Sequence, residues 1–220
     1  MHPHLFDLNQ EMHEITPVIL ITNTKVEKKY LNLLIDIAKK ISKKKIIFLS
    51  KKNLSFDSNK ISFYRLKSRS VINRKFIIKK LKSINIKTYV LLNYNYPFRN
   101  YKEIKRAIAI FKEKKINLIS ATVSPENPYK MWHYSNKKIK TILRYKKVKE
   151  SHSVPRQILP ITYIENGCFE IINISHKKQE LFISEIPYIS LSNNSQYSLK
   201  NIMGLYLKNK KYYSSNRLPS

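Results

Sequence analysis

Residues 17–50 decide the fold: they read PVILITN at 17–23, continue through a lysine-rich stretch, and read KIIFLS at 45–50. The two outer runs are short, apolar and rich in β-branched residues, which is typical of buried parallel strands. Between them, from Val26 onward, apolar residues recur at spacings of three and four while lysines fill the other positions. This spacing predicts an amphipathic helix. The stretch therefore predicts a strand–helix–strand unit.

The same alternation continues toward the C-terminus as far as Val123. We expect strands at Ile61–Leu66, Lys87–Leu92 and Asn117–Val123, and helices at Val71–Ile84 and Asn100–Lys115. Strands that alternate with helices predict an α/β, Rossmann-like fold, in which helices cover both faces of a mainly parallel sheet. Ligands of such sheets bind at the carboxyl ends of the strands, at a topological switch point.

The regular alternation stops after Val123. Residues 124–155 contain prolines, the only tryptophan and a basic segment at 137–149, and they predict a small excursion from the sheet. Further strands are expected at 161–164, 168–174 and 181–188, followed by a helix at 198–208. Asn166-Gly167 falls between two of these strands and predicts a hairpin turn, because both residues tolerate positive φ.

These patterns divide the chain into an N-terminal extension at 1–16, a domain at 17–208 and a tail at 209–220. One cysteine, Cys168, excludes an internal disulfide, and a small buried hydrophobic role is expected for it. The histidines and acidic residues show no metal-ligand spacing, so no metal ligands are predicted. No apolar run approaches the ~20 residues that span a bilayer, so no membrane partner is expected and the cytoplasm is the expected location.

The net charge is +29, from 43 basic and 14 acidic residues. Such a charge ordinarily suggests a polyanionic partner. However, the lysines are spread along the chain, isoleucine, asparagine and tyrosine are abundant, and there are only 2 glycines. This composition is typical of proteins from AT-rich coding sequences. A composition bias is therefore favoured over a dedicated nucleic-acid function, which stays open as an alternative.

The string RQILPITYIENG at 156–167 carries the most specific functional signal. It reads R-Q-x-L-P-x-x-Y-x-x-N-G and resembles the sugar-side signature of the acylneuraminate cytidylyltransferases, the CMP-sialic acid synthetase family. The string LNYNYPFR at 92–99 is similar to the family's L-Q-P-T-S-P-L-R. The resemblance implies contacts to the sugar from Asn93, Arg99, Arg156, Gln157, Tyr163 and Asn166. It also implies a homodimer formed through residues 124–155.

The family transfers a nucleotide: an acidic nine-carbon sugar attacks CTP, which yields the CMP-sugar and pyrophosphate. The resemblance implies Mg²⁺ as the cofactor, and it places Asn23, Lys25 and Ser50 on the nucleotide side. Three family features are absent from the sequence. The phosphate loop at 21–29 has no glycine, the S-T-D pattern reads Ser-Lys-Lys at 50–52, and the D-I-D pattern reads Ser-Gln-Tyr at 195–197. Magnesium therefore lacks recognisable carboxylate ligands, and no catalytic residue is assigned.

Three hypotheses stay open at this point. The first is a working cytidylyltransferase in which lysines replace the glycine loop. The second is a degenerate, non-catalytic relative that binds an acidic sugar or a partner protein. The third is a basic protein that binds RNA or phosphates through residues 137–149, with aromatic neighbours available for stacking. The missing phosphate loop and carboxylates favour the second hypothesis, or a severely reduced activity.

Overall fold

The computed structural model describes residues 15–22, 26, 28–43, 45–51, 59–66, 73–96, 99–148 and 150–184. Seven strands form one sheet in the order β3-β2-β1-β4-β8-β5-β9. Strands β1 (Thr16–Ile21), β2 (Ile46–Ser50), β3 (Ile61–Arg65) and β4 (Thr88–Asn93) run parallel to one another. Strand β5 (Asn117–Val123) pairs in parallel with β9 (Gln179–Ile183), and β8 (Tyr163–Asn173) is antiparallel to its two neighbours, β4 and β5. The predicted fold class is confirmed.

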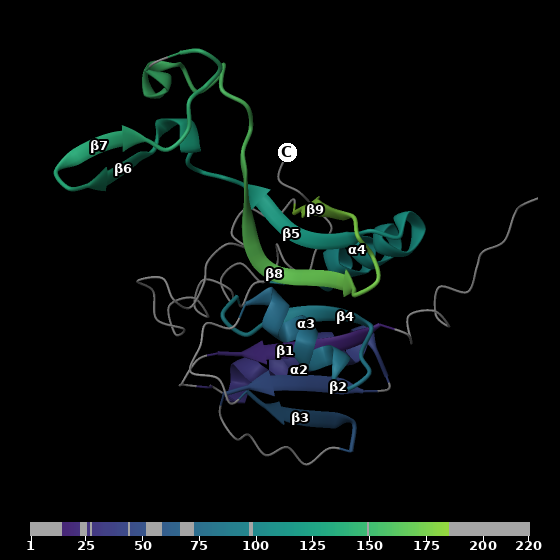
Figure 1. Cartoon of the computed structure of the whole chain (residues 1–220). Coiled ribbons are helices and arrows are strands. Elements are labelled where there is room, and N and C mark those ends of the chain that lie inside the picture. Colours follow the sequence, from purple (N-terminus) through teal and green to yellow (C-terminus); the bar gives the residue numbers. More distant parts are fainter. Residues whose placement is uncertain are drawn as a thin grey trace, which may run out of the picture.

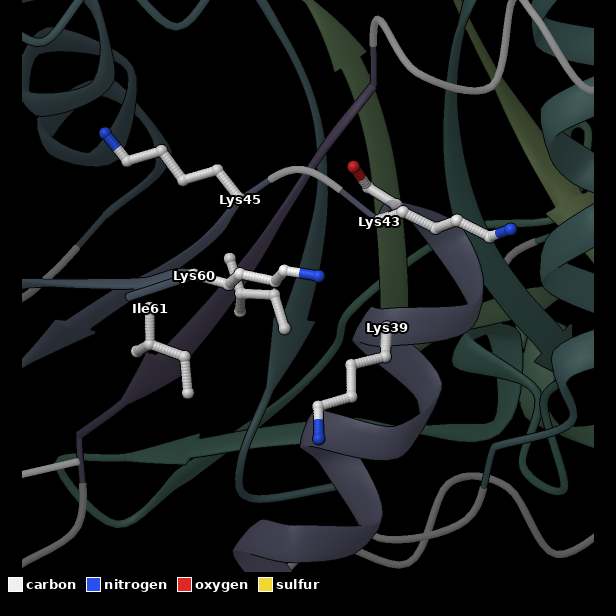
Figure 2. A pocket seen from close by; sticks show the side chains of 7 residues that line it. Lys39, Lys43, Lys45, Lys60 and Ile61 are labelled. Atoms are coloured by element: carbon white, nitrogen blue, oxygen red, sulfur yellow. The ribbon is translucent and has the colours of Figure 1, made fainter. Parts of the chain in front are cut away.

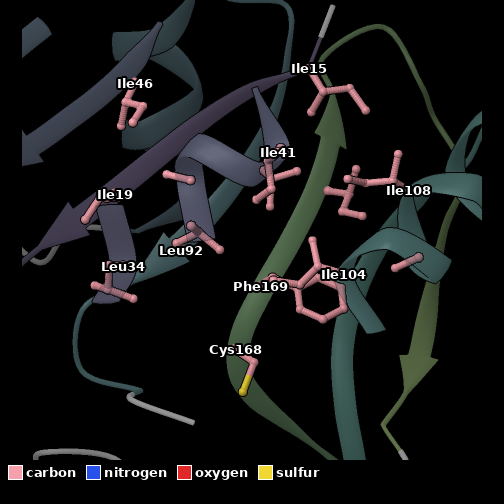
Figure 3. Packing of buried hydrophobic residues seen from close by; sticks show 14 of the residues in the cluster. Ile15, Ile19, Leu34, Ile41, Ile46, Leu92, Ile104, Ile108, Cys168 and Phe169 are labelled. Carbon is pink, nitrogen blue, oxygen red and sulfur yellow. The ribbon is translucent and has the colours of Figure 1, made fainter. Parts of the chain in front are cut away.

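Helices cover both faces of the sheet in the described part of the chain (Figure 1). Helices α2 (Lys28–Ile41) and α4 (Tyr101–Lys114) pack on one face, where residues such as Leu34 and Ile104 bury against β1, β4 and β8. Figure 3 shows this cluster, in which Leu92 of β4 and Phe169 of β8 lie among the helix side chains. Helix α3 (Arg74–Lys82) packs on the opposite face. The predicted strands and helices up to residue 123 are present, within a few residues of the expected bounds.

Residues 124–155 leave the sheet as predicted. They contain the short 3₁₀ helices η2 (Pro128–Lys130) and η3 (Ser151–Ser153) and a hairpin of β6 (Trp132–Ser135) and β7 (Lys138–Thr141). We call this segment the arm. Figure 1 shows that the arm projects beyond β5 and β8 and is well separated from the helices that cover the sheet.

The predicted hairpin turn at Asn166-Gly167 is wrong. The expected strands at 161–164 and 168–174 form the single strand β8, and Asn166 and Gly167 lie within it. Gly167 has a φ of +66°, and the register between β5 and β8 shifts between Ile119 and Ala121. A glycine at positive φ beside such a shift forms a β-bulge, which bends a strand without ending it. The first part of the expected strand at 181–188 belongs to β9, while residues 185–188 and the expected helix at 198–208 lie outside the described residues.

Candidate functional site

The order of the strands places a topological switch point between β1 and β4. From β1 the chain moves to β2 and then β3 on one side, and it returns to β4 on the other side. The crevice at the carboxyl ends of two such strands is the usual ligand site of an open α/β sheet. Polar residues lie at these strand ends: Thr22 after β1, Asn93 and Asn95 at the end of β4, and Ser50 at the end of β2.

A side-chain hydrogen bond links the two strand ends at the switch point. The Nδ2 of Asn95 donates to Oγ1 of Thr22 across 3.1 Å. The Oδ1 of Asn93 accepts from the backbone N–H of Asn95 at 3.0 Å, which fixes the turn after β4. The buried Ser50 lies beside this edge, because it pairs with Ile21. Asn93 and Ser50 were predicted as site residues from the sequence, whereas Thr22 and Asn95 were not, although a polar residue directly after an apolar strand was the available signal.

The bulge in β8 brings Asn166 to the same edge of the sheet. Leu91 of β4 pairs with Glu170, so the residues just before Glu170 continue past the end of β4. Asn166 is fully buried, and its Oδ1 accepts from Oγ of Ser120 at 2.6 Å and from the N–H of Cys168 at 3.1 Å. The Oγ of Ser120 accepts in turn from the N–H of Phe169 at 3.0 Å. The side chains of Ser120 and Asn166 thus replace the strand bonds that the bulge interrupts.

Arg99 is a positioning residue in this structure. It is 4% exposed, and its guanidinium donates to the carbonyl oxygen of Cys168 at 2.7 Å and to those of Tyr96 and Asn93. It therefore ties the turn after β4 to the bulge of β8. These guanidinium N–H groups already bond backbone carbonyls. A direct contact of Arg99 with a sugar therefore stays a prediction.

Two buried amide atoms at this edge have no hydrogen-bond partner among the described residues: Oδ1 of Asn95 and Nδ2 of Asn166. Leaving a buried polar atom unpaired costs about 1–3 kcal/mol. One atom is an acceptor and the other is a donor, so a ligand with polar groups of both kinds can satisfy them.

The other predicted sugar residues lie elsewhere, at the junction between the sheet and the arm. Arg156 is exposed and forms an ion pair with Glu126 at 3.0 Å, and its Nη1 donates to the carbonyl of Pro125. Gln157 is exposed, and Tyr163 is 44% exposed at the first position of β8, where it pairs with Val123. The structure therefore brings Asn93, Arg99, Asn166 and Ser50 together, and it places Arg156, Gln157 and Tyr163 in a second group. Asn23 and Lys25 lie outside the described residues.

The donors at this edge do not fit a magnesium ion held by the protein. Magnesium prefers carboxylate and phosphate oxygens as ligands, in octahedral geometry. The described side chains at this edge offer only hydroxyl and amide groups. In the described part of the chain, no group of three His, Cys, Asp or Glu side chains is placed to hold a metal ion. Glu103 is a buried carboxylate, but it accepts hydrogen bonds from Oγ of Ser184 at 2.9 and 3.0 Å.

No family model and no curated protein matches the sequence. Among solved structures, 4-diphosphocytidyl-2C-methyl-D-erythritol synthase from Anaerococcus prevotii matches with a TM-score of 0.53 and 13% identity, over 89% of this chain and 99% of that chain. CMP:2-keto-3-deoxy-manno-octonic acid synthetase complexed with CTP matches with a TM-score of 0.49 and 6% identity, over 90% of this chain and 99% of that chain.

These likenesses concern the fold. The chain has the Rossmann-like, mainly parallel sheet of the nucleotide-diphospho-sugar transferase type, the fold of the Anaerococcus synthase. No helix in the described ranges is both long and apolar enough to cross a membrane.

Proposed function

We propose that this chain is a cytidylyltransferase-like protein that binds CTP at the carboxyl edge of β1 and β4 and an acidic nine-carbon sugar beside it. We further propose that its nucleotidyl transfer is strongly reduced or lost. The observation that carries the proposal is the polar switch point, where Asn95 bonds Thr22 and two buried amide atoms are left unpaired. The fold supports it, because ligands of such sheets bind at this edge.

The two unpaired amide atoms suit different parts of a nucleotide or an acidic sugar. The Oδ1 of Asn95 is an acceptor, so it suits the amino group of cytosine or a ribose hydroxyl. The Nδ2 of Asn166 is a donor, so it suits a phosphate or carboxylate oxygen. We therefore assign the nucleotide to the Asn95 side and an anionic group to the bulge.

The proposed loss of turnover rests on the chemistry that phosphoryl transfer requires. Charge that develops on the triphosphate must be stabilised by a backbone cradle, cations or a metal ion. The loop at 21–29 has no glycine, and the sequence has Ser-Gln-Tyr at 195–197 where the family has aspartates. Losing such contributions costs several kcal/mol, and each ~1.4 kcal/mol lowers the rate tenfold. No step is assigned to magnesium, because the described donors do not fit it.

Arg156 is proposed as the residue that binds the carboxylate of the sugar. Its guanidinium and the Glu126 carboxylate are 58% and 60% exposed, so the ion pair between them is worth about 1 kcal/mol or less. A ligand carboxylate can therefore displace Glu126 at small cost, and an arginine fork binds it with two parallel hydrogen bonds.

The nucleotide site is tested by calorimetric titration of CTP into the wild type and into Asn95→Asp. This substitution keeps the shape of the side chain but places a negative charge in the proposed nucleotide site, where it repels the negatively charged nucleotide, so a loss of affinity of at least tenfold is expected. Asn32→Asp, at an exposed position on α2, is the matched control. Equal affinity of Asn95→Asp and wild type would place the nucleotide elsewhere.

We propose that the arm forms a homodimer interface. Residues directly opposite each other in a hairpin share a face, and Tyr134 pairs with Ile139 while Trp132 pairs with Thr141. The large side chains on this face are Trp132, Tyr134 and Ile139, which are 47%, 69% and 62% exposed. Exposed aromatic and aliphatic side chains gathered on one face are typical of a protein contact.

The same pairing disfavours the RNA alternative. His133 pairs with Lys140, and Ser135 pairs with Lys138, so these two lysines occupy the other face of the hairpin. RNA-binding surfaces combine stacking aromatics with basic groups on one surface. Here Trp132 and Tyr134 face away from those lysines, so a protein contact through the aromatic face fits the hairpin better.

A further inference from the structure

A pocket lined by lysines lies at the opposite edge of the sheet from the switch point. It has a volume of about 430 Å³, and its wall includes Ile46. Figure 2 labels five more residues of the wall: Lys39, Lys43, Lys45, Lys60 and Ile61. These residues come from the last turn of α2, the connection to β2 and the start of β3. Strands rise about 3.3 Å per residue, so the 5 residues of β2 separate this pocket from Ser50 by roughly 15 Å.

The pocket carries a concentrated positive charge. Four of its lining residues are lysines and none is a carboxylate. Within the described residues, Lys39, Lys43 and Lys45 have no carboxylate partner at ion-pair distance, whereas Arg74, Lys114 and Arg156 each form an ion pair with a glutamate. Like charges around a concavity focus the positive potential there and repel one another, so an anion bound among them relieves the repulsion.

Part of this pattern has an ordinary explanation. Lysine in the last turn of a helix compensates the helix dipole, which accounts for Lys39 in α2. It does not account for Lys45 and Lys60, which precede two different strands. The backbone N–H of Ile46 donates to the carbonyl of Lys60 at 2.8 Å, and Ile46 pairs with Ile61. The strand pairing therefore places the backbones of these two lysines side by side, next to an apolar wall.

We infer that this pocket binds a small phosphorylated compound, whose phosphate groups contact the lysines while its organic part packs against Ile46 and Ile61. Ammonium groups bind phosphate by charge-assisted hydrogen bonds. The volume is in the range of small-molecule sites, about 300–1,000 Å³. The site lies at the other edge of the sheet, so the inference is independent of the proposed nucleotide site and gives the chain a second anion site.

The test compares two triple variants that remove the same charge. The pocket variant is Lys39→Gln/Lys43→Gln/Lys45→Gln. The control is Lys75→Gln/Lys79→Gln/Lys82→Gln, at exposed positions of α3. Pyrophosphate is titrated by calorimetry at physiological salt, where surface charge is screened beyond about 8 Å. We expect the pocket variant to lose at least tenfold in affinity at one site and the control to stay within twofold of wild type.

Equal losses in both triples would overturn the inference, because the binding would then follow net charge alone. No loss in either triple would overturn it as well. Thermal unfolding supplies a second readout: pyrophosphate is expected to raise the melting temperature of wild type and control more than that of the pocket variant. Single-stranded RNA is titrated in parallel. If the pocket variant weakens binding of RNA but not of pyrophosphate, the small-molecule assignment is wrong.

Discussion

At Gly167 the backbone conformation and the packing both exclude a side chain. The φ of +66° is a left-handed conformation, and a Cβ built there lies 2.3 Å from Cε2 of Tyr96. Arg99 and Ser120 hold the chain directly after this glycine through the carbonyl of Cys168 and the N–H of Phe169. One small residue therefore sets the close approach of β8 to the turn after β4, where the proposed site lies.

Gly167→Ala is expected to lower the free energy of unfolding by about 1–2 kcal/mol from backbone strain, with a further loss from the clash with Tyr96. Urea unfolding measures the change. In a Tyr96→Ala background the clash is removed, so the same substitution is expected to cost less. An unchanged unfolding midpoint for Gly167→Ala would contradict the structural role assigned to the bulge.

Substitutions of Arg156 and Glu126 are expected to act in opposite directions on binding of an acidic sugar. Arg156→Ala removes the proposed carboxylate partner and is expected to weaken binding at least tenfold, or ~1.4 kcal/mol. Glu126→Ala removes the competing carboxylate and is expected to strengthen binding. Calorimetry with N-acetylneuraminic acid measures both, and Arg144→Ala, an exposed arginine of the arm, is the control. Equal binding by Arg156→Ala and wild type would contradict the assignment of Arg156 to the sugar carboxylate.

At the scale of elements, the hairpin of β6 and β7 presents two chemically different faces. Tyr134 and Ile139 lie on the apolar face, while Lys138 and Lys140 lie on the basic face. Exposed apolar groups of this size are rarely left in water without a partner. The geometry of the hairpin therefore allows the protein contact and the polyanion contact to be separated by substitution.

Tyr134→Glu/Ile139→Glu is expected to convert a dimer into a monomer, because it places charges on the apolar face. Lys138→Gln/Lys140→Gln lowers the net charge by the same amount on the other face and is expected to leave the dimer intact. Sedimentation velocity across a concentration series measures whether each variant is a monomer or a dimer. A wild-type protein that stays monomeric at high concentration would refute the proposed interface.

The strands and helices up to Val123 could be predicted because their signals are local: apolar runs for strands, three- and four-residue spacing for helices. The N-cap of α4 could also be predicted from the sequence. Asn100 accepts a hydrogen bond from the N–H of Lys102, as expected for an N-cap residue. The bulge at Asn166-Gly167 could not be predicted, because its partners, Ser120 and Arg99, are 46 and 69 residues away from the atoms that they bond. The local sequence shows a glycine, which permits a positive φ, but it does not show whether the strand ends at that residue.

At the scale of the molecule, the sheet separates two polar edges. The carboxyl edge holds hydroxyls and amides at the switch point, and the amino edge holds the lysine pocket. Neither Asn95 nor the pocket could be inferred from sequence spacing, because each depends on which strands become neighbours. Between the edges lies a core that buries several ionisable groups in their neutral forms.

The stability of this core is expected to fall at alkaline pH. Burial raises the pKa of the Cys168 thiol from 9.0 to about 12, and burial also raises the pKa of Tyr30 and Tyr89. The unfolded chain releases these protons at lower pH than the folded chain does, so stability is complete below about pH 9 and is lost as the pH rises toward 12. Urea unfolding from pH 8 to 11 is expected to show this decline, and Cys168→Ala is expected to flatten it. A flat profile would contradict the buried, neutral state of these groups.

The measurement that tests the central claim most directly combines CTP binding with pyrophosphate release. The protein is incubated with CTP, Mg²⁺ and a panel of nine-carbon acidic sugars, and binding is followed by calorimetry on the same sample. We expect CTP to bind, Asn95→Asp to bind it more weakly, and pyrophosphate release to stay near background. Release well above background would contradict the proposed loss of turnover, and absence of CTP binding by the folded protein would contradict the proposed site itself.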